Sequence, residues 1–282
     1  MSSSPLSSAQ AARAAVATRL YDLMKDAGFS GQELAVRCGW HKAKSSRIAR
    51  GKTPPSDADI RAWCSACGAD DQAADLIAAS RNAELMYVEW RQIHCGGMRR
   101  IHERTVPLYQ RTRSFRVYAS NVFPGMLQTA GYATGLLQAI TDFQGTPDDV
   151  TAAVQARLDR SRVIREGHHR FALLLEETVL YYRVSDDAAM AEQLEHLLSV
   201  MARPNISLGV IPMTARRNVW PLEAFYAFDD AQVAVETLTA EINLTAPSEI
   251  DAYLRAFAQL SRSAVRGTAS GALIEKALAA LG

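Results

Sequence analysis

Four short segments of helical periodicity, each followed by a glycine, make up the first 70 residues. Over residues 11–27 apolar side chains recur at steps of three and four, which predicts a helix that ends at Gly28. Three more helices are expected over residues 32–36, over residues 41–50 and between Ser56 and Gly68. The pattern therefore predicts an N-terminal all-α domain over residues 1–70.

The pattern changes beyond residue 70. Residues 71–112 are expected to form a helical connector and dimer contact, with a long helix over residues 71–104 that is interrupted at Gly96-Gly97. Runs rich in β-branched and aromatic residues follow, namely "SFRVYAS", "ISLGVIP", "EAFYAF" and "QVAVETL". Because amphipathic segments alternate with these runs, residues 113–282 are predicted to form an α+β domain with a mixed sheet flanked by helices.

Charge is distributed unevenly between the two parts of the chain. Residues 1–117 contain eighteen Lys and Arg against eleven Asp and Glu, a net +7, and the remainder contains thirteen against nineteen, a net −6. This asymmetry favours an N-terminal part that binds a polyanion and a C-terminal part with another role. No apolar run is long enough to span a bilayer, and the opening "MSSSPLSSAQ" has no signal-peptide pattern. We therefore expect a cytoplasmic protein without membrane contact, whose cysteines are reduced.

The predicted third helix is the most basic part of the chain. Six Lys and Arg and no Asp or Glu occur over Arg37–Lys52. Ala35 is small where the second and third helices would cross, Gly39 supplies a positive-φ turn, and Leu34 and Ile48 point inward. These features are typical of a helix-turn-helix unit. The alternative is an ordinary solvated face of a small helical bundle, but so many cations without an acid favour a nucleic-acid-binding face.

In a helix-turn-helix unit the early turns of the recognition helix enter the major groove of DNA. Arg47 is suited to a bidentate contact with guanine, and the lysines can reach guanine or phosphate. Residues just after the third helix and at the start of the second are candidates for phosphate contacts. The predicted DNA-binding residues are Gln32, His41, Lys42, Ala43, Lys44, Ser46, Arg47, Arg50, Lys52 and Thr53.

Two separate segments resemble one known family. "GFSGQELAVRCGWHKAKSSRIARGKTPPSDADIRAW" resembles the Cro/repressor-type (XRE) helix-turn-helix of the actinobacterial WhiJ-like regulators, over about residues 10–70. "VFPGMLQTAGYA" is similar to a Val-Pro-Gly-Leu-Leu-Gln-Thr signature of the same family, and "LLLEETVL", "EQLEHLL" and "NISLGVIP" follow in the family's order. The resemblance covers nearly the whole chain. It implies an antitoxin-like transcriptional regulator, typically encoded beside a small partner protein that modulates its DNA binding.

Two positions depart from the family pattern. Ser45 lies in the third helix where the family usually has Val or Ile, and Cys38 lies where it usually has Leu. Both residues are expected to weaken the apolar packing in the core of the helix-turn-helix unit. They therefore affect the stability of the unit more than its assignment as a helix-turn-helix.

The sequence offers little for metal binding or catalysis. Cys64 and Cys67 form a Cys-x-x-Cys pair, but no second close pair completes a zinc site, so small buried thiols explain them better. Other Cys and His side chains of the type that binds zinc occur elsewhere in the sequence, at Cys38, His41, His94 and Cys95. Because the G-x-S-x-G, P-loop and H-E-x-x-H motifs are missing, we predict no catalytic residue, metal or cofactor. Glu176 and Glu177 are expected at a strand-to-helix junction, where acidic side chains in the first turn interact favourably with the helix dipole.

Two C-terminal segments are candidates for binding a ligand or a protein partner. "NVFPGMLQT" places apolar residues around a Pro-Gly turn, which suits a pocket wall or partner groove, or simply the docking of a helix on the sheet. The loop "PMTARRNVWP" can hold an anionic ligand or a partner's acids, or can be a mobile surface loop. The residues concerned are Phe123, Met126, Leu127, Arg216, Arg217 and Trp220.

Together these features predict a sequence-specific DNA-binding transcriptional regulator that associates with the nucleoid when bound to its double-stranded operator. Because one small module buries little surface, we expect a homodimer that contacts two half-sites. The C-terminal domain is expected to dimerise and to sense a small protein partner or a small-molecule effector. The alternative is an enzyme of unknown reaction that carries a regulatory helix-turn-helix.

Overall fold

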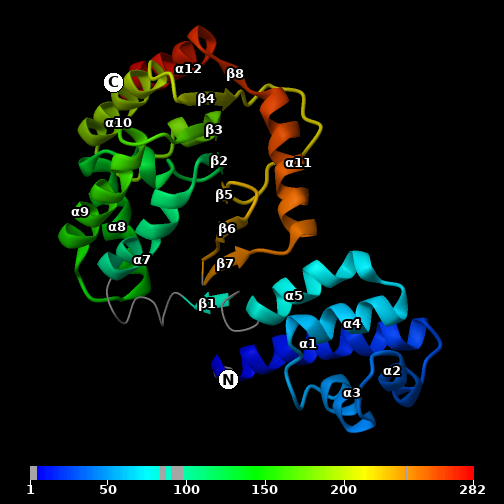
Figure 1. Ribbon diagram of the computed structural model, residues 1–282. Coiled ribbons are helices and arrows are strands. Elements are labelled where there is room, and N and C mark those ends of the chain that lie inside the picture. Colours follow the sequence, from blue (N-terminus) through cyan, green and yellow to red (C-terminus); the bar gives the residue numbers. More distant parts are fainter. Residues whose placement is uncertain (1–4, 83–86, 90–97, 239) are drawn as a thin grey trace. The chain divides into compact units, whose positions relative to one another are not determined.

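The computed structural model describes residues 5–82, 87–89, 98–238 and 240–282. It divides into two compact units (Figure 1). Unit 1 comprises Met1–Tyr87 and Asn243–Ile250, and unit 2 comprises Val88–Ile242 and Asp251–Gly282. Unit 1 carries the N-terminal helices, whereas unit 2 combines helices with most of a mixed sheet. The predicted fold class, an all-α helix-turn-helix domain followed by an α+β domain, is confirmed.

The helices of unit 1 are bounded by the capping serines and the glycines that the sequence places between them. Two of them begin with a capping box, in which Ser30 pairs with Glu33 and Ser56 pairs with Asp59. Gly39 turns the chain between the second and third helices with a φ of 67°, a conformation that side chains other than glycine rarely adopt. The elements are α1 (Pro5–Asp26), α2 (Gly31–Arg37), α3 (Lys42–Ala49), α4 (Asp57–Cys67), the 3-10 helix η1 (Asp70–Gln72) and α5 (Ala73–Asn82).

The core of unit 1 is centred on Trp63 of α4, which is 1% exposed. Its indole nitrogen donates a hydrogen bond of 2.8 Å to the carbonyl oxygen of Leu20 and so joins α4 to α1. Leu34 of α2 and Ile48 of α3 point into the same core, as their positions in the sequence predict. Burial of these large apolar side chains holds the short helices together, since helices of seven or eight residues are not stable alone.

The region between the two domains differs from the long helix predicted over residues 71–104. The structure has η1 and α5, then the short strand β1 (Tyr87–Glu89), then α7 (Met98–Arg111). The side chains of Leu76 and Ile77 on α5 belong to the core of unit 1. This part of the chain therefore extends the helical domain instead of forming one continuous connector. The predicted interruption at Gly96-Gly97 lies outside the described residues.

Unit 2 is organised around a mixed sheet. Its strands are β2 (Ser114–Ala119), β3 (Arg170–Glu176), β4 (Ile206–Ile211), β5 (Phe225–Phe228), β6 (Gln232–Glu236), β7 (Ala240–Leu244) and β8 (Val265–Arg266). With β1 included, the strand order is β1-β7-β6-β5-β2-β3-β4-β8 in the described residues. The central strands β2, β3 and β4 are parallel, with Val117 opposite Leu173 and Leu173 opposite Leu208. Most of their side chains are apolar and buried, as expected for parallel strands at the centre of a sheet.

Helices lie on both faces of the sheet (Figure 1). Phe225 of β5 packs against Tyr253 and Phe257 of α11 on one face. Phe228 of the same strand packs against Tyr109 of α7 on the opposite face, as the two-residue repeat of a strand requires. The helices are α7, α8 (Ala130–Gln144), α9 (Val150–Ser161), α10 (Asp187–Met201), α11 (Pro247–Ser263) and α12 (Thr268–Ala279), with 3-10 helices η2 (Gly125–Leu127), η3 (Arg162–Ile164) and η4 (Glu177–Leu180). None of the helices described is both long and apolar enough to cross a membrane.

Candidate functional site

The α2–turn–α3 segment has the geometry of a helix-turn-helix. Ala35 of α2 is 2% exposed, and α2 packs against α3. A larger side chain at this buried position would disturb the packing. After the turn at Gly39, Trp40 packs against Trp63 with 6.1 Å between the ring centroids. These contacts fix the orientation of α3 relative to the rest of unit 1.

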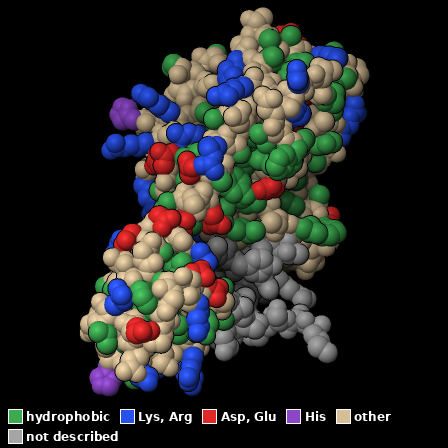
Figure 2. Space-filling model, turned by 90° about the vertical axis from the view of Figure 1, so that its right-hand side faces the viewer, with side chains coloured by type: hydrophobic (Ala, Val, Ile, Leu, Met, Phe, Trp, Pro, Cys, Tyr) green, Lys and Arg blue, Asp and Glu red, His purple; other side chains and the backbone are tan. Residues whose placement is uncertain are grey.

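Most of the predicted DNA-binding residues lie on the surface around α3. In Figure 2, basic side chains project at the lower end of unit 1, the end at which Figure 1 draws α3. Lys42 lies beside Gln32 of α2, to which its Nζ donates a hydrogen bond of 3.3 Å. Ser46 is half-buried. The exposed members of the predicted set are Gln32, His41, Lys42, Ala43, Arg47, Arg50, Lys52 and Thr53.

Lys44 is placed differently from the outer-face position predicted for it. Its Nζ forms an ion pair of 2.5 Å with Asp59 of α4 and lies 4.5 Å from the ring centroid of Trp40. Burial would raise the pKa of the Asp59 carboxyl, but the hydrogen bonds from Lys44 and Ser56 outweigh that effect and lower it. Lys44 therefore joins α3 to α4 and neutralises an acid that α4 brings close to the basic helix.

Ser45 fills its core position by hydrogen bonding. Its hydroxyl, in a residue 1% exposed, donates to the carbonyl oxygen of Gly31 (2.9 Å) or of Lys42 (3.0 Å). The bond to Gly31 ties α3 to the start of α2, so the serine replaces apolar packing with a directed contact. Cys38, the other departure, is half-buried, and its thiol contacts the carbonyl oxygen of Ala62 at 3.5 Å.

The thiols described in unit 1 are free, and Cys38 and Cys67 are half-buried. Cys64 is fully buried, and burial, with the nearby Cys67 adding to it, raises the pKa of Cys64 to about 11. Within the described residues no group of three or more His, Cys, Asp or Glu side chains is arranged to hold a metal ion. His94 and Cys95 lie outside those residues.

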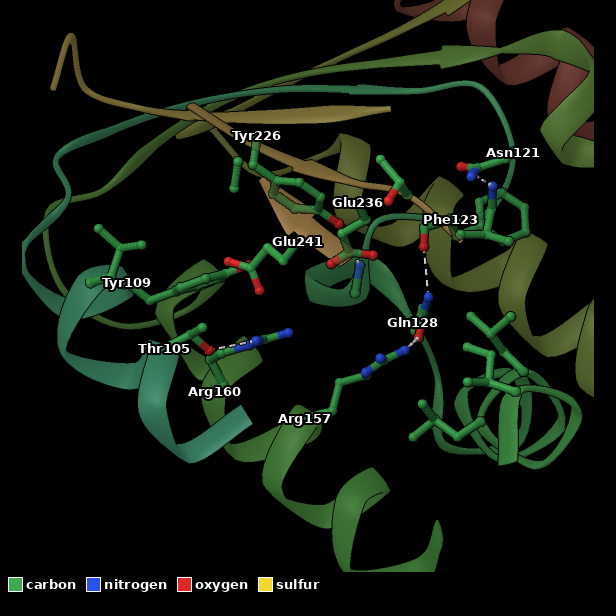
Figure 3. A pocket seen from close by; sticks show the side chains of 18 of the residues that line it. Thr105, Tyr109, Asn121, Phe123, Gln128, Arg157, Arg160, Tyr226, Glu236 and Glu241 are labelled. Atoms are coloured by element: carbon green, nitrogen blue, oxygen red, sulfur yellow. Dashed lines mark hydrogen bonds between the residues drawn. The ribbon is translucent and has the colours of Figure 1, made fainter. Parts of the chain in front are cut away.

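Unit 2 contains a cavity of about 440 Å³ between α7, α8, α9 and the strands β5 and β6 (Figure 3). Arg157 and Arg160 extend into it from α9, and Glu236 and Glu241 face them from the strands. Tyr226 lies above the arginines, where its hydroxyl accepts a hydrogen bond of 3.1 Å from the backbone nitrogen of Gly125. The sequence pattern did not single out these charged residues, because they come from segments far apart in the chain.

The residues predicted to form a ligand or partner site do not come together. Phe123 lines the cavity, but Met126 and Leu127 are 3% and 0% exposed and belong to the core of unit 2. The Pro-Gly turn therefore docks α8 on the sheet instead of providing a pocket wall of three apolar residues. Arg216 and Trp220 are exposed and are not part of the cavity lining.

Arg217 is bound within the protein. Its guanidinium donates two hydrogen bonds to the Glu176 carboxylate, at 2.7 and 2.5 Å, and this contact raises the pKa of Arg217. Tyr118 donates a third hydrogen bond to the same carboxylate at 2.7 Å. Glu176 is thus the acceptor that fastens the loop after β4, and Glu177 accepts a hydrogen bond from the backbone nitrogen of Met213. The strand-to-helix junction occurs as expected, with Glu177 in the first turn of η4, and both acids also make tertiary contacts.

Comparison with known families agrees with this division of the chain. Residues 6–77 match a helix-turn-helix domain of the Cro/XRE type, and residues 103–276 match a domain of unknown function, DUF5753. Comparisons with the curated proteins and with the solved structures gave no match. The helix-turn-helix match indicates a DNA-binding regulator. Because the second match spans more than half of the chain, from α7 to α12, this protein belongs to the DUF5753 family.

Proposed function

We propose that this protein is a sequence-specific transcriptional regulator that places the first turns of α3 in the major groove of its operator. The observation that carries the proposal is the set of exposed cations on α3 and just after it, namely Lys42, Arg47, Arg50 and Lys52. Asp59, the acid that α4 brings near this set, is already neutralised by Lys44. The exposed cations therefore remain available for phosphates and base edges.

Two of these cations have different roles in the proposal. Arg47 lies on the exposed side of α3, where its planar guanidinium can bind the O6 and N7 atoms of guanine. Lys52 follows the helix and can bind a phosphate. Arg47→Ala should weaken binding to the operator by about 1–3 kcal/mol and relax the base preference at one position. Lys52→Ala should weaken binding to all sequences alike and reduce the salt dependence by about one phosphate contact.

The test starts by selecting duplexes from a random DNA pool with the full chain, and then measures their binding by fluorescence anisotropy at several salt concentrations. Arg61→Ala is the matched control, because it removes the same charge from an exposed position on α4. Loss of sequence preference in Arg47→Ala but not in Arg61→Ala supports the proposal. Equal losses in the two variants, or no enrichment of any sequence in the selection, would refute it.

We further propose that the protein binds DNA as a homodimer. A single helix-turn-helix domain buries little surface on DNA, and two copies on half-sites about 34 Å apart provide the affinity of a specific regulator. The selected duplexes should then contain two inverted copies of one short sequence, one helical turn apart. Light scattering should give twice the mass of the chain, and a single half-site with a monomer mass would contradict this part of the proposal.

The C-terminal α+β domain is proposed to act by binding and to supply the regulatory input. The resemblance to WhiJ-like, antitoxin-like regulators supports a small partner protein, encoded nearby, that binds residues beyond Asp71. Hydrogen–deuterium exchange of the full chain, with and without the product of an adjacent gene, tests this idea. Protection confined to unit 2 is expected, whereas protection of α3 would mean that the partner competes directly for the DNA-binding face.

A further inference from the structure

The cavity in unit 2 is large enough for a small organic molecule. Its volume of about 440 Å³ falls in the range of natural ligand pockets, which span roughly 300–1,000 Å³. Its walls come from α7, α8, α9 and the sheet, so the site is assembled by the fold of unit 2 alone. The two sides of the cavity differ in chemistry, and this difference indicates the class of ligand.

One side of the cavity is cationic. Arg157 and Arg160 are three residues apart on α9 and therefore share a face of the helix. Arg157 donates from Nη1 to the Gln128 side-chain oxygen at 2.5 Å, and Arg160 donates from Nη1 to the Thr105 hydroxyl at 2.7 Å. Figure 3 shows both guanidinium groups directed into the open space. Tyr109 holds the second of them, with the guanidinium carbon of Arg160 4.6 Å from its ring centroid.

The two arginines have more hydrogen-bond donors than the protein satisfies. A guanidinium has five N–H donors, yet within the described residues each side chain makes one hydrogen bond, and the Nε atoms of both are buried without a partner. Buried donors without acceptors are rare in proteins because they cost free energy. Burial and the neighbouring Arg160 lower the pKa of Arg157 to about 10. An added anion would relieve both the unmet hydrogen bonds and the repulsion between the cations.

Glu236 does not supply that anion. Glu236 and Glu241 both face the arginines across the cavity, but among the described residues Glu236 forms no ion pair with either arginine. The surrounding protein raises the pKa of its carboxyl through burial, although the cavity leaves the side chain accessible. The charge of Arg157 opposes this rise.

The other side of the cavity is apolar. Leu136, Leu137 and Ile140 line it from α8, and Phe228 of β5 and Leu108 of α7 are further apolar residues of the lining. Such a wall gains free energy when it covers an aliphatic or alicyclic chain. We propose that the cavity binds a small amphipathic anion, a carboxylate on an apolar skeleton, with its head group at Arg157 and Arg160 and its chain against α8. Its role as an effector rests on the proposed function, whereas the binding itself does not.

Head-group specificity provides the test, with decanoate, decanol and decyltrimethylammonium as probes of equal chain length. Binding to the full chain without DNA is measured by calorimetry below the micelle concentrations, so failure of DNA binding would not affect the outcome. Decanoate should bind at least tenfold more tightly than decanol, and the cationic probe should bind no better than decanol. Equal binding of decanoate and decanol, or tighter binding of the cation, would overturn the proposal.

Variants locate the head group. Arg160→Gln should reduce the preference for decanoate over decanol below threefold, because the chain contacts remain while one cation is lost. Arg162→Gln is the matched control, since Arg162 is exposed, pairs with Asp159 and lies outside the cavity. Retention of the full preference in Arg160→Gln would place the anion elsewhere and contradict the assignment. The head-group comparison on the unaltered chain decides the question if Arg160→Gln fails to fold.

Discussion

The contact between Arg217 and Glu176 makes the sharpest stability prediction. Arg217→Met removes both guanidinium hydrogen bonds to Glu176, which is 5% exposed. The Glu176 carboxylate then keeps only the hydrogen bond from the Tyr118 hydroxyl among these side-chain contacts. Methionine keeps much of the aliphatic volume, so the change tests the charge more than the packing. The adjacent Arg216 is exposed and provides a control of the same chemistry in the same loop.

The magnitude follows from burial. Removing one partner of a buried ion pair typically costs about 3–5 kcal/mol, because the remaining charge is left without compensation. The Arg217 side chain is 21% exposed, so water screens part of the interaction, and Tyr118 continues to stabilise the carboxylate. We therefore expect a loss of about 2–3 kcal/mol in the free energy of unfolding. For a domain of this size that loss lowers Tm by about 4–12 °C.

Calorimetric unfolding of the full chain measures this loss in the transition of unit 2. Arg216→Met should change its Tm by less than about 2 °C, as surface substitutions usually do. Adding Glu176→Gln to Arg217→Met should recover part of the loss, because a buried amide costs less than an unpaired carboxylate. A coupling energy of at least about 1 kcal/mol between the two sites is expected from the double-mutant cycle. If Arg217→Met costs no more than Arg216→Met, the pair does not stabilise the loop and the reasoning is wrong.

Two further predictions concern unit 1. Ser45→Ala should lower the free energy of unfolding, measured by urea denaturation, by about 1 kcal/mol, because the hydrogen bond from its hydroxyl to Gly31 is lost. Ser46→Ala is the control and should have almost no effect. Equal losses in the two variants would contradict a special role for Ser45. The lowered pKa of Asp59 means that the unfolded chain binds its proton more readily than the folded one. The stability that Asp59 contributes is present above its unfolded pKa of about 3.9 and is lost as pH falls through the lower folded value. The Tm should therefore fall as pH is lowered from about 6 to 2, and this fall should be shallower in Asp59→Asn. Parallel curves of Tm against pH for the two proteins would show that the Lys44–Asp59 contact does not cause the fall.

Much of the helix-turn-helix unit could be predicted from the sequence because its signals are local. The glycine at position 39 marks a turn that favours glycine, and Ser30 and Ser56 cap the helices that follow them. Apolar residues such as Leu34 and Ile48 recur at helical spacing, so their burial follows from the periodicity. The strands of unit 2 were likewise visible in their runs of β-branched and aromatic residues. Such patterns need no knowledge of what lies opposite in space.

The tertiary structure decided which charged residues are available and where a cavity forms. Lys44 and Arg47 look alike in the sequence, yet α4 brings Asp59 to the first and leaves the second exposed. Arg217 pairs with a glutamate 41 positions earlier in the chain. The cavity combines side chains from α7, α8, α9 and the sheet, whose spacing along the chain carries no period. Local patterns specify helices, strands and turns, but charge pairing and cavities depend on contacts between distant segments, which only the packed fold determines.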